Sequence, residues 1–147
     1  MGARLNMGKV QPDAYRAMNA MDSFVKNSAI PPLQREMIKI RASQINGCAY
    51  CVHEHTGDAR KLGETEQRIY LMSVWREAGP AFTDEEKLLL EMTEEITLIQ
   101  QHGLSDALYD KAIGFWGEVR TAQVIMAIIT INAWNRIGVG LNMHPAL

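Results

Sequence analysis

The feature that most constrains the fold of this chain is a long apolar stretch near its C-terminus, over residues 118–137. The stretch is too long for a typical strand, and its apolar side chains would surround a helix almost completely. A helix of this kind must lie at the centre of a core or be shared with another subunit. Its apolar positions include Val124, Ile125, Met126, Ala127, Ile128, Ile129 and Ile131.

Helix patterns also fill the rest of the chain, and no segment alternates with the period of two that half-buried strands require. The expected fold class is therefore all-α, a compact domain of about six to seven helices. At 147 residues the chain is long enough for one core, so we expect a single domain over 1–147. The expected helices are 12–26, 32–46, 48–63, 65–77, 83–103, a short helix from 105, and 118–137.

Local signals mark where several of these helices begin and end. Pro12 and Pro32 suit the first turn of a helix, and Asn46-Gly47 predicts a stop because both residues tolerate the left-handed conformation. The run Thr83-Asp84-Glu85-Glu86 predicts a capping box. Gly103 predicts the end of the helix that follows this box.

Charge and composition exclude several classes of partner. The chain has 15 Lys and Arg against 17 Asp and Glu, spread along its length, which gives no electrostatic footprint for nucleic acid. The first residues lack the apolar segment of a secretory signal, and the charge-free stretch from Thr121 to Asn135 is shorter than the ~18 residues of a spanning helix. We expect a cytoplasmic protein with no membrane partner. No motif for a nucleotide, flavin or haem cofactor is present.

Chemistry concentrates in the segment INGCAYCVHEH, residues 45–55, which holds both cysteines and two of the four histidines. At 100° per residue, Cys48, Cys51 and His55 fall within about 60° of one another on a helix. They are therefore predicted to share one face. His53 points well away from that face and is predicted to take no part in the chemistry.

Three interpretations of this segment differ in what the cysteines do. A closed zinc site needs four ligands, and this face supplies three, with His102 and His144 far away in sequence, so no metal is expected. A permanent disulfide is disfavoured because helical positions three apart hold their Cβ atoms about 5 to 6 Å apart, whereas a relaxed disulfide needs about 3.5 to 4.5 Å. A pair that opens and closes fits the spacing best.

The residues alone leave the nucleophile open. The positive end of the helix dipole lies beside Cys48, which favours the first cysteine as the thiolate. His55 is four residues from Cys51 and can exchange a proton with it, which favours the second cysteine. Position does not decide between them.

A wider pattern includes Glu36, which stands twelve residues before Cys48. Together Glu36, Cys48, Cys51 and His55 form E-x(11)-C-x-x-C-x-x-x-H, which resembles the signature of the AhpD-like alkylhydroperoxidases of the carboxymuconolactone decarboxylase superfamily. The sequence around the motif and the later segment TINAWNRIGVG are also similar to that family, so the resemblance covers roughly residues 15–140.

The resemblance implies a thiol-dependent peroxidase that reduces hydroperoxides. In such proteins Cys51 would be the peroxidatic thiolate and Cys48 the resolving thiol and proton donor, with His55 as proton relay and Glu36 as base. An external dithiol would then reduce the disulfide. The resemblance further implies a homo-oligomer, as a dimer, trimer or hexamer. Tyr50 departs from the best-known members, which carry a histidine between the cysteines, so the relay and the reducing partner are expected to differ.

Two other classes of function remain: a redox-responsive interaction module or disulfide reductase without significant peroxidase turnover, and a metal-binding protein. If Glu36 is buried beside a histidine and a thiol, its pKa is expected to rise. Asn132 and Asn135 on the apolar last helix are candidates for ordering the site, because buried amides must be hydrogen-bonded. Trp75 and Trp116 are predicted to pack in the core or against a subunit rather than line a substrate mouth.

Overall fold

The computed structural model describes residues 2 and 4–146, and among them it contains helices and no strand, which confirms the all-α expectation. Eight α-helices and two 3-10 helices follow one another along this part of the chain. They are α1 (Met7–Val10), α2 (Pro12–Lys26), α3 (Pro32–Asn46), α4 (Ala49–Lys61), α5 (Glu66–Leu71), η1 (Met72–Glu77), η2 (Gly79–Ala81), α6 (Asp84–Thr97), α7 (Ile99–His102) and α8 (Asp106–Gly140).

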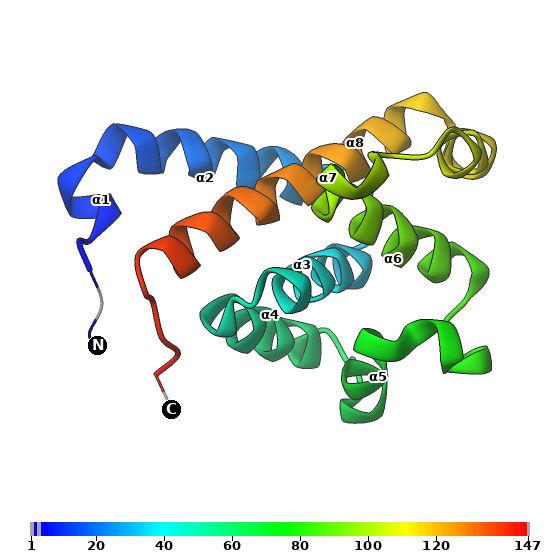
Figure 1. Cartoon of the computed structure of the whole chain (residues 1–147), viewed down its shortest axis with the longest axis horizontal. Helices are drawn as coiled ribbons and strands as arrows, with labels where there is room; N and C mark the ends of the chain where they lie inside the picture. The colour runs from blue at the N-terminus through cyan, green and yellow to red at the C-terminus, as the bar shows by residue number, and fades with distance from the viewer. Residues whose placement is uncertain (1, 3, 147) are drawn as a thin grey trace.

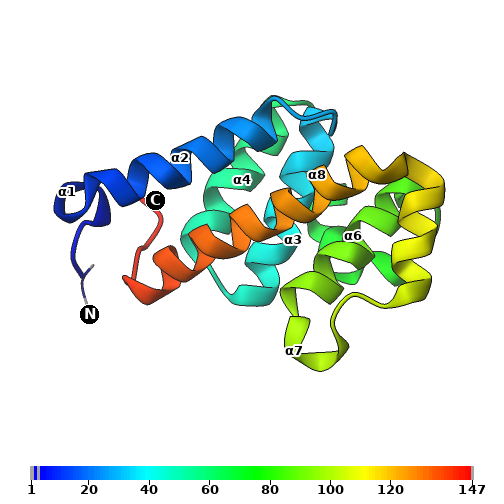
Figure 2. The same cartoon turned by 90° about the horizontal axis from the view of Figure 1, so that it is seen from above.

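The core forms where α3, α6 and α8 pack on one another (Figures 1 and 2). α2 lies along α8, and α4 packs against α3. Burial of apolar side chains from α3, α6 and α8 supplies the main hydrophobic stabilisation. The buried side chains include Met37, Ile38, Ile40, Leu88, Leu89, Leu90, Met92, Val124, Ala127, Ile128 and Ile131.

The long helix α8 bends sharply at Gly117, which has φ 75° and ψ 172° and separates two segments of different direction (Figure 2). These are the short helix and the long apolar helix that the sequence predicts. The apolar segment is buried on one side only, since Val119 is 73% and Ile129 is 42% exposed. Its length and composition alone would also allow a membrane span. In this structure its buried side packs on α3 and α6.

Two predicted helix boundaries are confirmed in detail. Gly47 ends α3 in the left-handed conformation, with φ 67°. At the start of α6, Thr83 Oγ1 accepts a hydrogen bond from the Glu86 amide at 3.2 Å, and the Thr83 amide donates to Glu86 Oε2 at 2.8 Å. Both ends depend on local chemistry, which explains why they can be read from the sequence.

Other boundaries differ from expectation. The helix expected over 65–77 changes to 3-10 geometry after Leu71, which lets Met72 and Trp75, three residues apart, both face the core. The helix expected to reach Gly103 breaks at Leu98 into α6 and α7. The short α1 has no counterpart among the expected helices.

The two ends of the described chain lie at the same end of the molecule (Figures 1 and 2). The Arg4 amide donates to the Leu141 carbonyl at 3.0 Å, and the Arg4 guanidinium donates to the Gly140 carbonyl at 2.9 Å. The chain after α8 folds back, and the Met143 amide donates to the Gly138 carbonyl at 2.9 Å. Residues from both ends of the described chain thereby bind the end of α8.

A buried carboxylate, Glu94 on α6, joins three elements. Glu94 Oε1 accepts from Arg41 Nε at 2.8 Å and from Trp75 Nε1 at 2.8 Å, and Oε2 pairs with Arg76. Burial raises the pKa of Glu94, but its hydrogen bonds to Arg76 and Trp75 and the charge of Arg41 outweigh burial and lower the pKa below its ordinary value. Glu94 is therefore an ionised tie between α3, η1 and α6.

We expect Glu94→Ala to lower the free energy of unfolding by about 2 to 3 kcal/mol, because the substitution leaves the buried indole N–H of Trp75 unpaired and removes the carboxylate that binds the half-buried Arg41 guanidinium. Urea denaturation measures this loss. Glu91→Ala is a matched control on the same helix, where a more exposed carboxylate lies 3.7 Å from Arg76, and it should cost less than about 1 kcal/mol. Equal losses in the two variants would contradict the structural role of Glu94.

Candidate active site

The site is built on the corner between α3 and α4. The chain turns at Gly47, and the Cys48 amide donates to the Ser43 carbonyl at 3.0 Å. Cys48 is the N-cap of α4, with extended backbone angles of φ −86° and ψ 91°. Its Sγ accepts a hydrogen bond from the Cys51 amide at 3.3 Å. Cys48 therefore precedes the helix and does not belong to its first turn.

Cys48 and Cys51 form a disulfide, with their Cα atoms 5.3 Å apart. The argument against a permanent disulfide had one wrong premise, because it placed both cysteines inside a helix, whereas Cys48 is the N-cap. With Cys48 extended, the two side chains meet without the separation that helical positions impose. Cys48 is 2% and Cys51 is 5% exposed, and only Cys51 borders the adjoining cleft.

Glu36 of α3 and His55 of α4 meet beside this corner. Glu36 Oε2 accepts a hydrogen bond from His55 Nδ1 at 2.9 Å, and Glu36 Oε1 pairs with Lys39 Nζ at 2.9 Å. Each oxygen of the carboxylate thus has its own partner. Glu36 is only 7% exposed. The residue that the sequence motif singles out is therefore buried.

The pKa of Glu36 moves in the direction opposite to expectation. Burial raises the pKa, as expected, but the hydrogen bond from His55 and the charge of Lys39 lower it by more. The net pKa lies below its ordinary value of 4.5. Glu36 is therefore a carboxylate near neutral pH, stabilised by the hydrogen bond from His55 and by the charge of Lys39, which lies one helical turn away.

A cleft of about 470 Å³ opens beside Cys51, Glu36 and His55. Tyr15 and Trp134 form one aromatic wall, with ring centroids 5.1 Å apart in edge contact, and Trp134 Nε1 donates to Asp22 Oδ2 at 2.8 Å. The apolar part of the lining consists of Val25, Ala127, Ile131, Ile137 and Met143.

Charged and phenolic side chains complete the lining of this cleft. Basic and acidic groups both contribute, so the cleft has no strong net charge. Tyr50, the residue between the cysteines, also borders it, and partial burial together with the charge of Glu54 raises the pKa of the Tyr50 phenol. The charged lining residues are Asp22, Lys26, Arg35, Glu36, Lys39, Glu54 and Asp58, together with His55.

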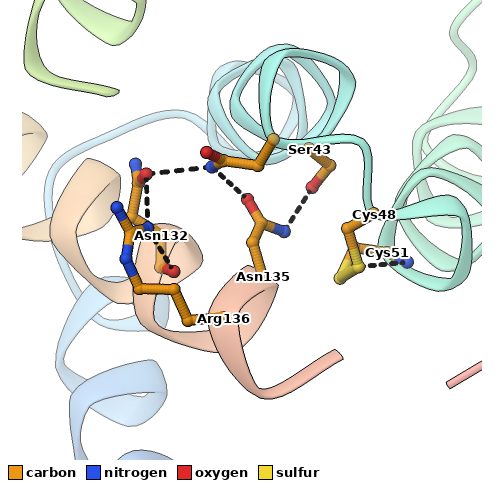
Figure 3. Close-up of a disulfide and its surroundings, with 7 residues drawn as sticks. Ser43, Cys48, Cys51, Asn132, Asn135 and Arg136 are labelled. Atoms are coloured by element: carbon orange, nitrogen blue, oxygen red, sulfur yellow. Dashed lines mark hydrogen bonds between the residues drawn. A yellow bond between two sulfur atoms is a disulfide. The ribbon is translucent and has the colours of Figure 1, made fainter. Parts of the chain in front are cut away.

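Amide side chains fasten the corner to α8 (Figure 3). Asn46 Nδ2 donates to Asn132 Oδ1 and to Asn135 Oδ1, both at 2.9 Å. Asn135 Nδ2 donates to Ser43 Oγ at 2.9 Å. The two asparagines that the sequence marks as candidates therefore hold the backbone that carries Cys48, through Ser43 and Asn46.

The remaining sequence candidates lie outside this cleft. His53, His102 and His144 are exposed and do not line it. Trp75 and Trp116 donate to Glu94 and Glu85, which supports packing roles for both indoles. Sequence reasoning missed Trp134 as a cleft residue and missed Gly138, which approaches both sulfurs from α8.

Among the described residues, Glu36, His55 and Asp58 offer ligand atoms within 4.8 Å of one another, close enough to hold a cation. Three ligands are one short of a closed zinc site, and both oxygens of Glu36 already have partners. In the disulfide state neither sulfur is a thiolate ligand. The cluster is described more completely as a hydrogen-bonded carboxylate and imidazole.

A model of the carboxymuconolactone decarboxylase family matches residues 12–95, which is more than half of the chain. The chain belongs to this family. The matched segment contains Glu36, Cys48, Cys51 and His55. The uncharacterised protein YdfG of Bacillus subtilis strain 168 is 40% identical over 146 residues and covers 99% of both chains.

Solved structures place the same fold in two further proteins. A crystal structure from Agrobacterium tumefaciens has a TM-score of 0.94 at 37% identity, covering 99% of this chain and 100% of its own; it is a protein of unknown function suggested to be the antioxidant defence protein AhpD. An uncharacterised peroxidase-related protein with an alkylhydroperoxidase AhpD core, from Ralstonia eutropha JMP134, has a TM-score of 0.79 at 21% identity and covers 95% and 74%. The fold is AhpD-like, and the second likeness concerns the fold alone.

The lowered pKa of Glu36 predicts how stability depends on pH. A carboxylate whose folded pKa lies below its unfolded value stabilises the protein above about pH 4.5, and this stabilisation is lost as the pH falls through the folded pKa. We expect the free energy of unfolding of wild type to fall more steeply below about pH 4.5 than that of Glu36→Gln. Chemical denaturation of the oxidised proteins between about pH 3 and 7 measures the two slopes.

Lys39→Met provides the control for this measurement. It removes one of the two groups that lower the pKa of Glu36, so its slope should lie between those of wild type and Glu36→Gln. Parallel pH profiles for all three proteins would contradict the assigned electrostatics. The contribution of Glu94 is common to the three proteins and cancels in the comparison.

Proposed function

We propose that this protein is a thiol-dependent peroxidase whose Cys48–Cys51 pair cycles between dithiol and disulfide. The observation that carries the proposal is the redox pair itself, closed in this structure, beside a hydrogen-bonded Glu36–His55 pair at a substrate-sized cleft. Membership of the family and the descriptions of its AhpD-like neighbours support the same chemistry.

The proposed cycle has three balanced steps. The Cys51 thiolate attacks the terminal oxygen of a hydroperoxide ROOH, the O–O bond breaks, and with one proton the products are Cys51 sulfenic acid and the alcohol ROH. The Cys48 thiol then attacks the Cys51 sulfur, which forms the disulfide and releases water. An external dithiol finally reduces the disulfide by exchange and is itself oxidised.

Access supports Cys51 as the peroxidatic residue. Cys51 borders the cleft, whereas Cys48 is the more buried of the two and lies at the N-cap behind it. Electrostatics alone would favour a thiolate at Cys48, where the helix amide donates to the sulfur. A peroxide must reach the sulfur that it oxidises, so access takes precedence, and Cys48 suits the resolving role.

Proton transfer in this proposal depends on which nitrogen of His55 is occupied. Because Glu36 accepts from Nδ1, Nε2 is the ring nitrogen that can take a proton from the thiol. The lowered pKa of Glu36 makes it a weaker base than expected and a better stabiliser of the imidazolium. We therefore assign the immediate base role to His55 and let Glu36 orient it and balance its charge.

The size and lining of the cleft support an organic hydroperoxide with an apolar or aromatic body as substrate. Its volume of about 470 Å³ lies within the range of small-molecule sites, far above what hydrogen peroxide fills. Tyr15, Trp134 and Ile131 offer apolar contact surface. Regeneration by a dithiol in each cycle suits a reducing compartment, so we also propose a cytoplasmic location.

The test is turnover with dithiothreitol as reductant and cumene hydroperoxide or hydrogen peroxide as oxidant. Wild type should consume cumene hydroperoxide faster, and Cys51→Ser should lose at least about a hundredfold in rate because the nucleophile is gone. In intact mass spectra, Cys48→Ser should gain one oxygen after one equivalent of peroxide, and Cys51→Ser should gain none. Undiminished turnover by Cys51→Ser would end the proposal.

A redox-responsive interaction module is the second candidate, favoured by exposed apolar side chains on the same helix that touches the disulfide. Phe115, Val119, Ile129 and Val139 of α8 are all exposed. We propose that exposed apolar side chains of α8 contact a second copy of the chain, in either functional class.

Size-exclusion chromatography of the oxidised and reduced protein separates the two candidates. The module predicts a change in oligomeric state on reduction together with negligible peroxide turnover. The peroxidase predicts steady turnover and the same elution volume in both states. Cys48→Ser/Cys51→Ser is the control, because its elution volume should not respond to reductant.

A further inference from the structure

Gly138 lies on α8 where this helix passes the disulfide. A Cβ atom at this position would lie 2.8 Å from Cys48 Sγ and 3.4 Å from Cys51 Sγ. The backbone of α8 departs from helical angles at Gly117 and not at Gly138, so the backbone conformation does not itself require glycine here. The absent side chain makes room for the sulfurs.

Neighbouring contacts keep α8 from moving away from the disulfide. Asn135, one turn before Gly138, is bonded to Ser43 Oγ and Asn46 (Figure 3). The carbonyl of Ser43 accepts from the Cys48 amide. One set of hydrogen bonds thus fixes the helix and the cysteine corner relative to each other. In addition, the Gly138 carbonyl accepts a hydrogen bond from the Met143 amide.

The sulfurs are less constrained in the dithiol than in the disulfide. In the disulfide, Cys48 Sγ is bonded to Cys51 Sγ and lies against Gly138. In the dithiol each sulfur can rotate about χ1. Two unbonded sulfurs must lie further apart than bonded ones, and the Cys51 sulfur can move toward the cleft, which Cys51 borders. A methyl group at 138 would therefore oppose the disulfide more than the dithiol.

We infer that Gly138 is a positioning residue for the cysteine pair, which favours the disulfide by leaving space for both sulfurs and so sets how readily the pair is reduced. The equilibrium concerned is dithiol plus glutathione disulfide giving protein disulfide plus two glutathione molecules. The inference rests on the proposed redox cycle of the pair but not on peroxide as the oxidant.

The experiment is equilibration of the full chain with glutathione redox buffers, followed by acid quenching and a count of free thiols. Gly138→Ala should lower the equilibrium constant for disulfide formation at least about tenfold, which corresponds to about 30 mV for two electrons. Gly140→Ala is the matched control, since it adds the same methyl group on the same helix with nothing within 4 Å. Its constant should equal that of wild type.

A merely structural role for Gly138 would destabilise both redox states equally. The free energy of unfolding is therefore measured for the oxidised and the reduced forms, and Gly138→Ala should lower that of the oxidised form more. In a Cys48→Ala background the same substitution should cost less than in oxidised wild type, because the sulfur that it meets is gone. This comparison remains available if oxidised Gly138→Ala folds poorly.

The outcomes separate this inference from the proposed function. An equilibrium constant for Gly138→Ala that equals wild type, or that shifts toward the disulfide, overturns the inference while leaving the redox cycle intact. Equal losses of stability in the oxidised, reduced and Cys48→Ala proteins also overturn it. A wild-type pair that no glutathione buffer reduces would instead remove the proposed cycle.

Discussion

The interaction on which the rest of this site depends is the amide clamp between the end of α3 and α8. Asn46 and Asn135, with Ser43, replace water by mutual hydrogen bonds in a buried region, where unpaired polar groups would be costly. The clamp fixes two things at once: the corner from which Cys48 starts α4, and the helix that carries Gly138. Hydrophobic packing brings these helices together, but the directional bonds set their register.

The functional groups of the site differ in their electrostatic environment and in their access to the cleft. The same carboxylate, Glu36, binds Lys39 through one oxygen and His55 through the other, so its charge is balanced on α3 while it orients a side chain on α4. Cys48 lies at the N-terminus of α4, where the Cys51 amide donates to its sulfur, whereas Cys51 borders the cleft. Two adjacent sulfurs thereby differ in environment although they belong to one short motif.

The sequence predicted correctly those features that depend on neighbouring residues in the chain. It did not predict features that depend on how distant helices pack. Gly47 and Thr83 are read correctly because left-handed turns and capping boxes involve few neighbouring residues. The role of Lys39 was readable at one helical turn from Glu36 and was missed. Cys48 was placed inside the helix that it caps, so the Cβ separation assumed for the cysteine pair was that of two helical residues. Gly138 could not be found, because its contact with sulfur exists only once α8 crosses the corner.

The meeting of the two ends of the described chain has a consequence for mutagenesis. Arg4 binds the carbonyls that end α8, and Met143, a few residues further on, is part of the cleft lining. Substitutions in the first residues of the described chain would therefore act on the end of α8 that borders the cleft, rather than on a remote face.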